Sequence, residues 1–246
     1  RLANAGERIR LVDALGEDIL DYSYDNQWHP ITDGLGFSLV IQDDAAPWNS
    51  WESASNWHPS SVLFGSPGMP DIAPLAFAPI RVNEVLTAPL LPNGDAIELF
   101  NPTTTNVDRS GWWLSDNLAS PKKYRIPNGR VIGPGAFAVF TEADFNPGGA
   151  GFALDSQGDD VWLFSADAAG QLTGYAHGFR FGAAEPGVSF GRHLTSLGEE
   201  HFVPQSMNTL GTNNASPRIG PVVLSEIMYH PPDLVLRAGV GPLNAD

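Results

Sequence analysis

The chain repeats itself, and this repeat limits what it can fold into. Four pairs of segments correspond at offsets between 142 and 152 residues: IRVNEVL (80–86) with VVLSEIM (222–228), GERIRL (6–11) with GDDVWL (158–163), GFSL (36–39) with GVSF (187–190), and WHPS (57–60) with FVPQ (202–205). Self-similarity of this kind indicates copies of one structural unit. The offset varies because the copies differ in loop length.

The repeat predicts one complete copy and two partial ones. Residues 1–68 correspond to the second half of a module, residues 80–212 to a complete module, and residues 222–246 to the start of a third. Between them, residues 69–79 and 213–221 contain proline and are predicted to be short, stiff linkers. We therefore interpret the chain as part of a longer array, with any targeting signal outside it.

Within the complete copy the apolar residues alternate with a period of two. Short runs rich in aromatic and branched residues, at 96–100, 136–140 and 161–164, are bounded by turn-forming residues. No segment has the period of a long amphipathic helix. We expect an all-β chain of immunoglobulin-like β-sandwich modules in tandem. Alternation predicts that Trp112 and Leu114 are buried structural anchors and that Trp113 is half-exposed.

Charge and composition exclude several classes of function. The net charge is −15, with 13 Lys and Arg against 28 Asp and Glu. Nucleic-acid affinity comes largely from basic residues that displace counterions, so we expect no nucleic-acid partner. No apolar run reaches the roughly 18 residues that span a bilayer, so we expect no membrane insertion. Because cysteine is absent, disulfides and thiolate sites are excluded.

Several segments of residues 80–212 resemble the lamin tail domain family in its bacterial form. They occur in the family's order: IRVNE (80–84), DAIELFNP (95–102), VDRSGWWLSD (107–116), YRIP (124–127), VIGPGAF (131–137) and GDDVWLF (158–164). The resemblance implies an immunoglobulin-like fold without catalytic activity. Bacterial members look like parts of long secreted or surface proteins. We therefore expect an extracellular or cell-surface location, and no chromatin role for so acidic a chain.

A hydrolase-like motif and six histidines are the candidate catalytic or metal-binding groups of the chain. Residues 187–191 read G-x-S-x-G, but no helical pattern follows Ser189, as a nucleophile elbow would require. His193 and His201 are near it only in sequence. The six histidines lack zinc-ligand spacing, and those before prolines, such as His29 and His58, are expected at strand ends. We predict no enzyme activity and no bound cofactor.

Calcium is the remaining metal to consider. Residues 155–160, DSQGDD, are rich in oxygen ligands, but they lack the spacing of an EF-hand. A solvated turn is the expected structure, and a weak calcium loop is the alternative.

Two glutamates lie within predicted strands. Alternation from Ile80 places Glu84 on the apolar face, where a carboxylate must be paired. We expect Glu84 to be a structural anchor that accepts hydrogen bonds, unless a bulge turns it outward. Glu226 repeats this placement in the third copy. Glu98 is predicted to lie on the solvent side.

Three tryptophans lie close together in a loop-like segment that lengthens the first copy. Trp57 takes the position of Phe202 and is predicted to anchor the loop on the sandwich. Trp48 and Trp51 fall in the inserted residues, where exposed indoles could form a platform for a ligand such as a sugar.

Together these patterns predict a non-catalytic spacer and protein-interaction or adhesion module. Its partner would be a protein or polysaccharide at the cell surface. The alternative is a carbohydrate-binding accessory module attached to a secreted hydrolase or a spore coat kinase-like enzyme. Two further hypotheses are catalysis through Ser189 and DNA binding by analogy with animal lamins. The sequence favours both less than the two functions above.

Overall fold

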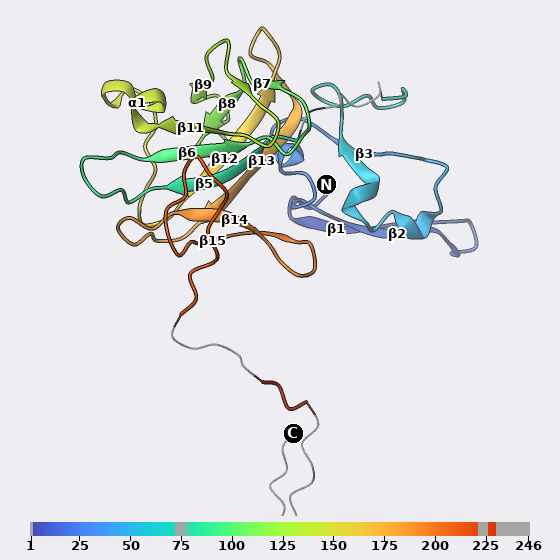
Figure 1. The fold of residues 1–246 in the computed structure, drawn as a ribbon. Coiled ribbons are helices and arrows are strands. Elements are labelled where there is room, and N and C mark those ends of the chain that lie inside the picture. The colour runs from blue at the N-terminus through green and yellow to red at the C-terminus, as the bar shows by residue number, and fades with distance from the viewer. Residues whose placement is uncertain (1, 72–76, 78, 221–225, 230–246) are drawn as a thin grey trace, which may run out of the picture.

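The computed structural model describes residues 2–71, 77, 79–220 and 226–229. In this part of the chain the regular structure is mostly β-strand, and the only α-helix is the single turn α1 (Glu142–Phe145). Figure 1 shows an N-terminal unit (residues 2–71) beside a β-sandwich (residues 79–218). The predicted all-β, immunoglobulin-like fold is confirmed.

Two antiparallel sheets form the sandwich. Its elements are β5 (Arg81–Leu86), β6 (Ala96–Phe100), β7 (Val107–Asp108), β8 (Trp113–Ser115), β9 (Tyr124–Arg125), β10 (Val131–Ile132), β11 (Phe137–Thr141), η4 (Pro147–Gly149), β12 (Asp159–Ala166), β13 (Leu172–Phe181), β14 (Phe190–Leu194) and β15 (Glu200–Pro204). One sheet has the order β11-β6-β5-β14-β15 and the other β13-β12-β8-β9, while β7 and β10 form a separate pair. The three predicted strand runs correspond to β6, β11 and part of β12.

The core lies between these sheets. Val82 and Ile97 from one sheet and Leu163 from the other are fully buried. Trp112 and Leu114 belong to the same cluster, with 6% and 0% of their surface exposed. Burial of large apolar side chains from both inner faces is what stabilises a sandwich of this kind.

The N-terminal unit consists of two hairpins and short helical turns. Its elements are β1 (Gly6–Val12), β2 (Asp18–Asp25), η1 (Pro30–Thr32), β3 (Leu39–Ile41), η2 (Trp48–Ser50), η3 (Ala54–Asn56) and β4 (Trp57–Pro59). β1 pairs with β2, and β3 pairs with β4. η1 packs against β13, so the unit lies directly on the sandwich.

Contacts at the ends of the two units extend beyond the predicted boundaries. Asp71 accepts a hydrogen bond of 2.8 Å from Ser61 Oγ, so the N-terminal unit continues past residue 68. Phe77 packs edge-on against Trp112, within the predicted linker. At the other end Arg218 N donates to Pro204 O at 2.7 Å, six residues beyond the predicted end of the module at residue 212. Side-chain packing and these hydrogen bonds are not visible in local composition.

Residues 222–246, predicted to begin a third module, lie outside the described residues apart from 226–229, which are exposed. Among the described residues, no helix combines the length and apolar character needed to cross a bilayer.

Candidate functional site

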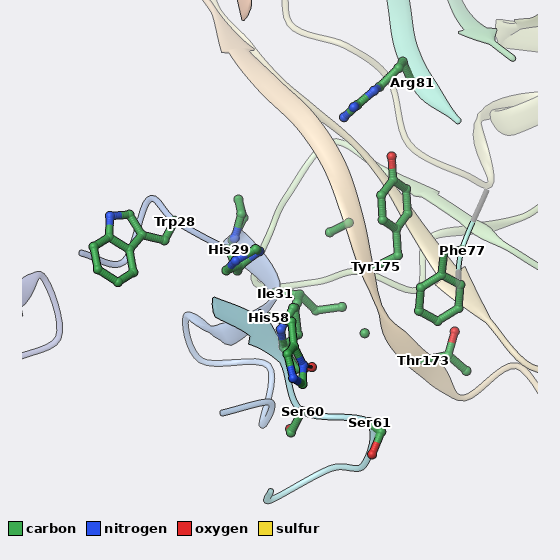
Figure 2. Close-up of a pocket in the computed structure, with 14 residues that line it drawn as sticks. Trp28, His29, Ile31, His58, Ser60, Ser61, Phe77, Arg81, Thr173 and Tyr175 are labelled. Carbon is green, nitrogen blue, oxygen red and sulfur yellow. Dashed lines mark hydrogen bonds between the residues drawn. The ribbon is translucent and has the colours of Figure 1, made fainter. Parts of the chain in front are cut away.

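A pocket lies where the N-terminal unit meets the sandwich, and we call it the interface pocket. Its volume is about 400 Å³. The N-terminal unit contributes Trp28, His29, Ile31, His58, Ser60 and Ser61, and the sandwich side contributes Phe77, Arg81, Thr173 and Tyr175. Figure 2 shows Arg81 and Tyr175, on sandwich strands, across from the two histidines.

The two histidines of the interface pocket are held by backbone carbonyls. His29 Nε2 lies 2.9 Å from Trp57 O, and His58 Nδ1 lies 2.8 Å from Pro59 O. Each of these nitrogens therefore donates, which leaves the other ring nitrogen as an acceptor. Burial lowers the pKa of His29, although its carbonyl partners oppose the shift. His29 is therefore expected to be neutral at pH 7.

Arg81 and Tyr175 supply donors on the opposite wall. Arg81 forms an ion pair with Glu200, with Arg81 Nε 4.0 Å from Glu200 Oε1, and its guanidinium carries only hydrogen-bond donors. Tyr175 Oη donates to Ile80 O at 2.6 Å, and burial raises the pKa of Tyr175 to about 12, so the phenol stays neutral. The aromatic faces of Trp28 and Phe77 complete a lining that suits a small polar ligand with an apolar face.

Serine, histidine and aspartate lie near one another here without forming a catalytic triad. Ser61 Oγ donates to Asp71, and His58 Nδ1 bonds to a carbonyl. Among the described hydrogen bonds none joins Ser61 to His58, which is the contact that would activate the hydroxyl.

His177 connects three strands beside the interface pocket. Its Nδ1 accepts from Val82 N at 3.0 Å, so Nε2 carries the proton and donates to Glu200 Oε2 at 2.9 Å. Burial lowers the pKa of His177, and the Glu200 hydrogen bond opposes this. Burial pushes the pKa of Glu200 upward, but His177, Arg81 and Arg192 outweigh it and lower that pKa to about 2. No local sequence pattern indicates this role, because His177 lies in an ordinary strand pattern.

Glu84 and Glu98 form a buried pair of carboxylates. A bulge between Val82 and Glu84 breaks the alternation, and it places Glu84 opposite Glu98 on β6. Alternation placed Glu84 on the face of Val82, whereas the bulge puts it on the face of Glu98. Glu84 is still buried and accepts hydrogen bonds, which is what we expected of a structural anchor. Glu98 was predicted to be on the solvent side, and this was wrong, because both carboxylates are completely buried.

Residues 205–218, the covering segment, bury this pair and satisfy it. Glu84 Oε1 accepts from Ser189 Oγ at 2.6 Å and from Thr209 N at 2.8 Å, while Oε2 accepts from Thr209 Oγ1. Glu98 accepts from Asn83 Nδ2 at 2.7 Å and from Gly211 N. No ion pair within the described residues reaches either carboxylate. Burial raises the pKa of Glu98 to about 7, although the hydrogen bonds from Gly211 and Asn83 act to lower this pKa.

Ser189, the serine of the G-x-S-x-G segment, is thus a structural residue. It is completely buried, and its hydroxyl proton points to Glu84 rather than to a histidine. His193 and His201 face each other across β14 and β15, and both are exposed.

The tryptophans of the inserted loop separate into two environments. Trp57 is 7% exposed and stacks on Tyr22, with ring centroids 5.5 Å apart. Trp51 packs edge-on against both rings, at 5.6 Å from Tyr22 and 5.7 Å from Trp57. Trp48 is 51% exposed. A ligand platform on this loop would therefore rest mainly on Trp48, because Trp51 is engaged in the aromatic cluster.

The DSQGDD turn is organised by its own hydrogen bonds. Asp155 N donates to Asp159 Oδ2 at 3.0 Å, and Gln157 N donates to Asp155 Oδ1 at 2.8 Å. Asp160 accepts from Arg180 Nε at 2.7 Å. Within the described residues no group of three or more acidic or histidine side chains is placed to hold a metal ion.

Comparison with known proteins gives one match. The family model described as Lamin Tail Domain matches residues 74–177, which cover the sandwich from before β5 to within β13. No curated protein and no solved structure matches the chain. The match agrees with the immunoglobulin-like fold, and it ends before β14, β15 and the covering segment.

Proposed function

We propose that the chain is a non-catalytic spacer and protein-interaction module of a secreted or cell-surface protein. One observation carries the proposal: the N-terminal unit packs directly on β13 through η1. The two units therefore form one rigid block rather than two domains joined by a flexible linker. Such a block can hold other domains at a fixed distance and present its loops for adhesion. The net charge of −15 favours solubility.

The N-terminal unit corresponds, in this proposal, to the second half of a sandwich like the complete one. The pairs Leu39↔Pro59, Val40↔His58 and Ile41↔Trp57 have the same register as Phe190↔Pro204, Gly191↔Val203 and Arg192↔Phe202. The backbone bond from Ser60 N to Ser38 O, 2.8 Å, has its counterpart in that from Gln205 N to Ser189 O, 2.9 Å. These matches support a common ancestry of the two units.

Two further correspondences support the same proposal. Gly6 and Gly158 both have positive φ, and a Cβ would lie 2.3 Å from Tyr24 O at the first and 3.1 Å from Phe181 O at the second. The stacked pair of Trp57 with Tyr22 occupies the place of Phe202 with Phe179. A glycine that must avoid a facing carbonyl and a ring pair between the two hairpins are specific features of packing.

Distance measurements between two spin labels test the rigid block. Because the chain has no cysteine, Leu15→Cys and Leu197→Cys provide two unique labelling sites, and these side chains are 87% and 83% exposed. One label lies in the N-terminal unit and the other in the sandwich. We expect a single narrow distance distribution. A broad distribution like that of freely jointed domains would contradict the proposal.

A second candidate is a carbohydrate-binding accessory module, and the interface pocket favours it. An aromatic ring can stack on a sugar face, and the Arg81 donors and the imidazole acceptors can bond its hydroxyls. Binding of the 246-residue chain to an array of bacterial and plant glycans tests this function. Specific binding that is lost in Trp28→Ala and retained in Trp48→Ala would assign it to the interface pocket. The reverse pattern would assign it to the loop, and no binding would reject it.

A further inference from the structure

Two exposed histidines lie directly opposite each other on the hairpin of β14 and β15. His193 pairs with His201 in the antiparallel register, and both side chains are exposed. Directly opposite residues of an antiparallel pair share one face of the sheet, with Cβ atoms about 5 Å apart. Each imidazole can therefore direct one ring nitrogen toward a common point. Spacing along the chain does not reveal this pair, because strand pairing brings it together.

The hairpin holds the two histidine backbones in a fixed register. Thr195 N donates to Glu199 O at 2.9 Å and closes the loop between the strands. On its other side β14 pairs with β5. Asn214 of the covering segment donates to Arg192 O at 2.8 Å, directly before His193. The backbone is thus ordered before an ion binds, so binding loses little conformational entropy.

The charges around the histidine pair favour a cation. Glu199 Oε2 lies 3.6 Å from His201 Nε2, and the Glu199 side chain is 65% exposed. Arg192, the neighbouring basic residue on β14, lies on the opposite face by alternation. It is paired with Glu200, with Arg192 Nη1 3.0 Å from Glu200 Oε1. A cation between the imidazoles therefore gains the attraction of Glu199 without facing Arg192.

The N-terminal unit shows that the fold does not require histidine at these positions. When the register that relates the two hairpins is continued by one pair, His193 and His201 correspond to Gln42 and Asn56. A backbone hydrogen bond of 2.8 Å from Gln42 N to Asn56 O continues the pairing there. The comparison rests on the proposed correspondence between the two units. It means that the imidazoles do not serve the pairing of the strands.

We propose that His193 and His201 chelate a divalent transition-metal ion of the zinc class. Imidazole nitrogen is a preferred ligand of zinc, at a distance of about 2.0–2.1 Å. Each ring offers one nitrogen, and water completes the coordination. Glu199 supplies negative charge beside the ion. Two protein ligands make a smaller site than a group of three, which the described residues lack.

Calorimetric titration of the 246-residue chain with Zn²⁺ tests the site. Excess Mg²⁺ is present, because it saturates carboxylate sites and has little affinity for imidazole. We expect zinc to bind the wild type and to bind at least about tenfold more weakly to His193→Gln and to His201→Asn, since each variant loses the chelate. Both variants carry the residues of the N-terminal unit. Leu194→Gln is the matched control: it changes an exposed residue on the opposite face and should bind zinc like the wild type.

Nuclear magnetic resonance of the histidine rings identifies the ligands. Zn²⁺ should shift the ring signals of His193 and His201 together and leave those of His29, His58 and His177 in place. Lowering the pH should release the zinc, because protons compete for the imidazole nitrogens. A dissociation constant above about 1 mM for the wild type, equal binding by wild type and both histidine variants, or ring signals that respond separately would overturn the proposal.

Discussion

Ser189 Oγ donates a hydrogen bond of 2.6 Å to Glu84 Oε1, and neither side chain has any surface exposed to solvent. The contact joins β5 to the residue before β14, which are 105 positions apart in the chain. It explains why a serine in a hydrolase-like motif is structural here. Its proton is committed to a carboxylate that would otherwise be buried with fewer partners.

Replacing this serine should therefore lower stability. Ser189→Ala removes a donor to a buried carboxylate, and we expect the free energy of unfolding to fall by about 1–3 kcal/mol. Urea denaturation followed by tryptophan fluorescence measures the change. Ser196→Ala, in an exposed turn, is the control and should have no comparable effect. Equal stability of the two variants would contradict the assigned role.

The stability of the chain should depend on the protonation of Glu98. Burial raises its folded pKa to about 7 from 4.5, so between these values the folded state binds more protons than the unfolded state. Ionised Glu98 therefore destabilises the fold, and its contribution improves as the pH falls from about 7.5 to 5, by roughly 2–3 kcal/mol. The measurement is urea denaturation over this pH range.

Comparison with Glu98→Gln isolates this effect. His177 acts in the opposite direction, because its lowered pKa makes the folded state bind fewer protons as the pH falls through 6.5. Asp95, whose pKa burial raises to about 6, acts in the same direction as Glu98. Both contributions are common to the wild type and the variant and cancel in their difference. A difference that does not change with pH would contradict the assignment to Glu98.

A pair of substitutions tests the correspondence between β3 and β14. A Cβ on Gly191 would lie 2.2 Å from Gln205 Nε2, so Gly191→Val should cost about 1–3 kcal/mol through overcrowding. Combining it with Gln205→Ser recreates the Val40 and Ser60 pair of β3 and β4. We expect a favourable coupling of about 1 kcal/mol in the double-mutant cycle. Simple additivity would mean that the two sites are not equivalent.

Two tryptophans of one loop should differ sharply in their effect on stability. Trp57→Ala removes a buried, stacked indole and should cost about 3–5 kcal/mol. Trp48→Ala removes a side chain that is 51% exposed and should change stability by no more than about 0.5 kcal/mol. Thermal or urea denaturation of both variants gives the comparison. Similar losses in the two would contradict the packing of this loop.

Local sequence patterns predicted the strands but not what covers them. The runs at 96–100 and 161–164 alternate clearly, and both are strands because alternation is itself the property of a half-buried strand. Strict alternation put Glu84 on the wrong face, since a bulge inserts one residue without a composition signal. Glu98 accepts a hydrogen bond from Gly211 N, 113 positions away, and no local pattern encodes that contact.

The interface pocket could not be predicted from the sequence, for a similar reason. His29 and His58 were expected at strand ends. His58 is the middle residue of the short strand β4, and His29 lies outside any strand, directly before η1. The opposite wall, with Arg81 and Tyr175, comes from the complete module. The repeat predicted that the two units exist, but not that η1 would pack on β13 and bring the walls together.

The central claim is that the lamin-tail-like sandwich is an independent unit whose two sheets enclose one core. Residues 77–220, expressed alone, test it by circular dichroism and thermal denaturation. We predict a β-type spectrum with little helix and a single cooperative transition. A helical spectrum, or the absence of a cooperative transition, would contradict the account.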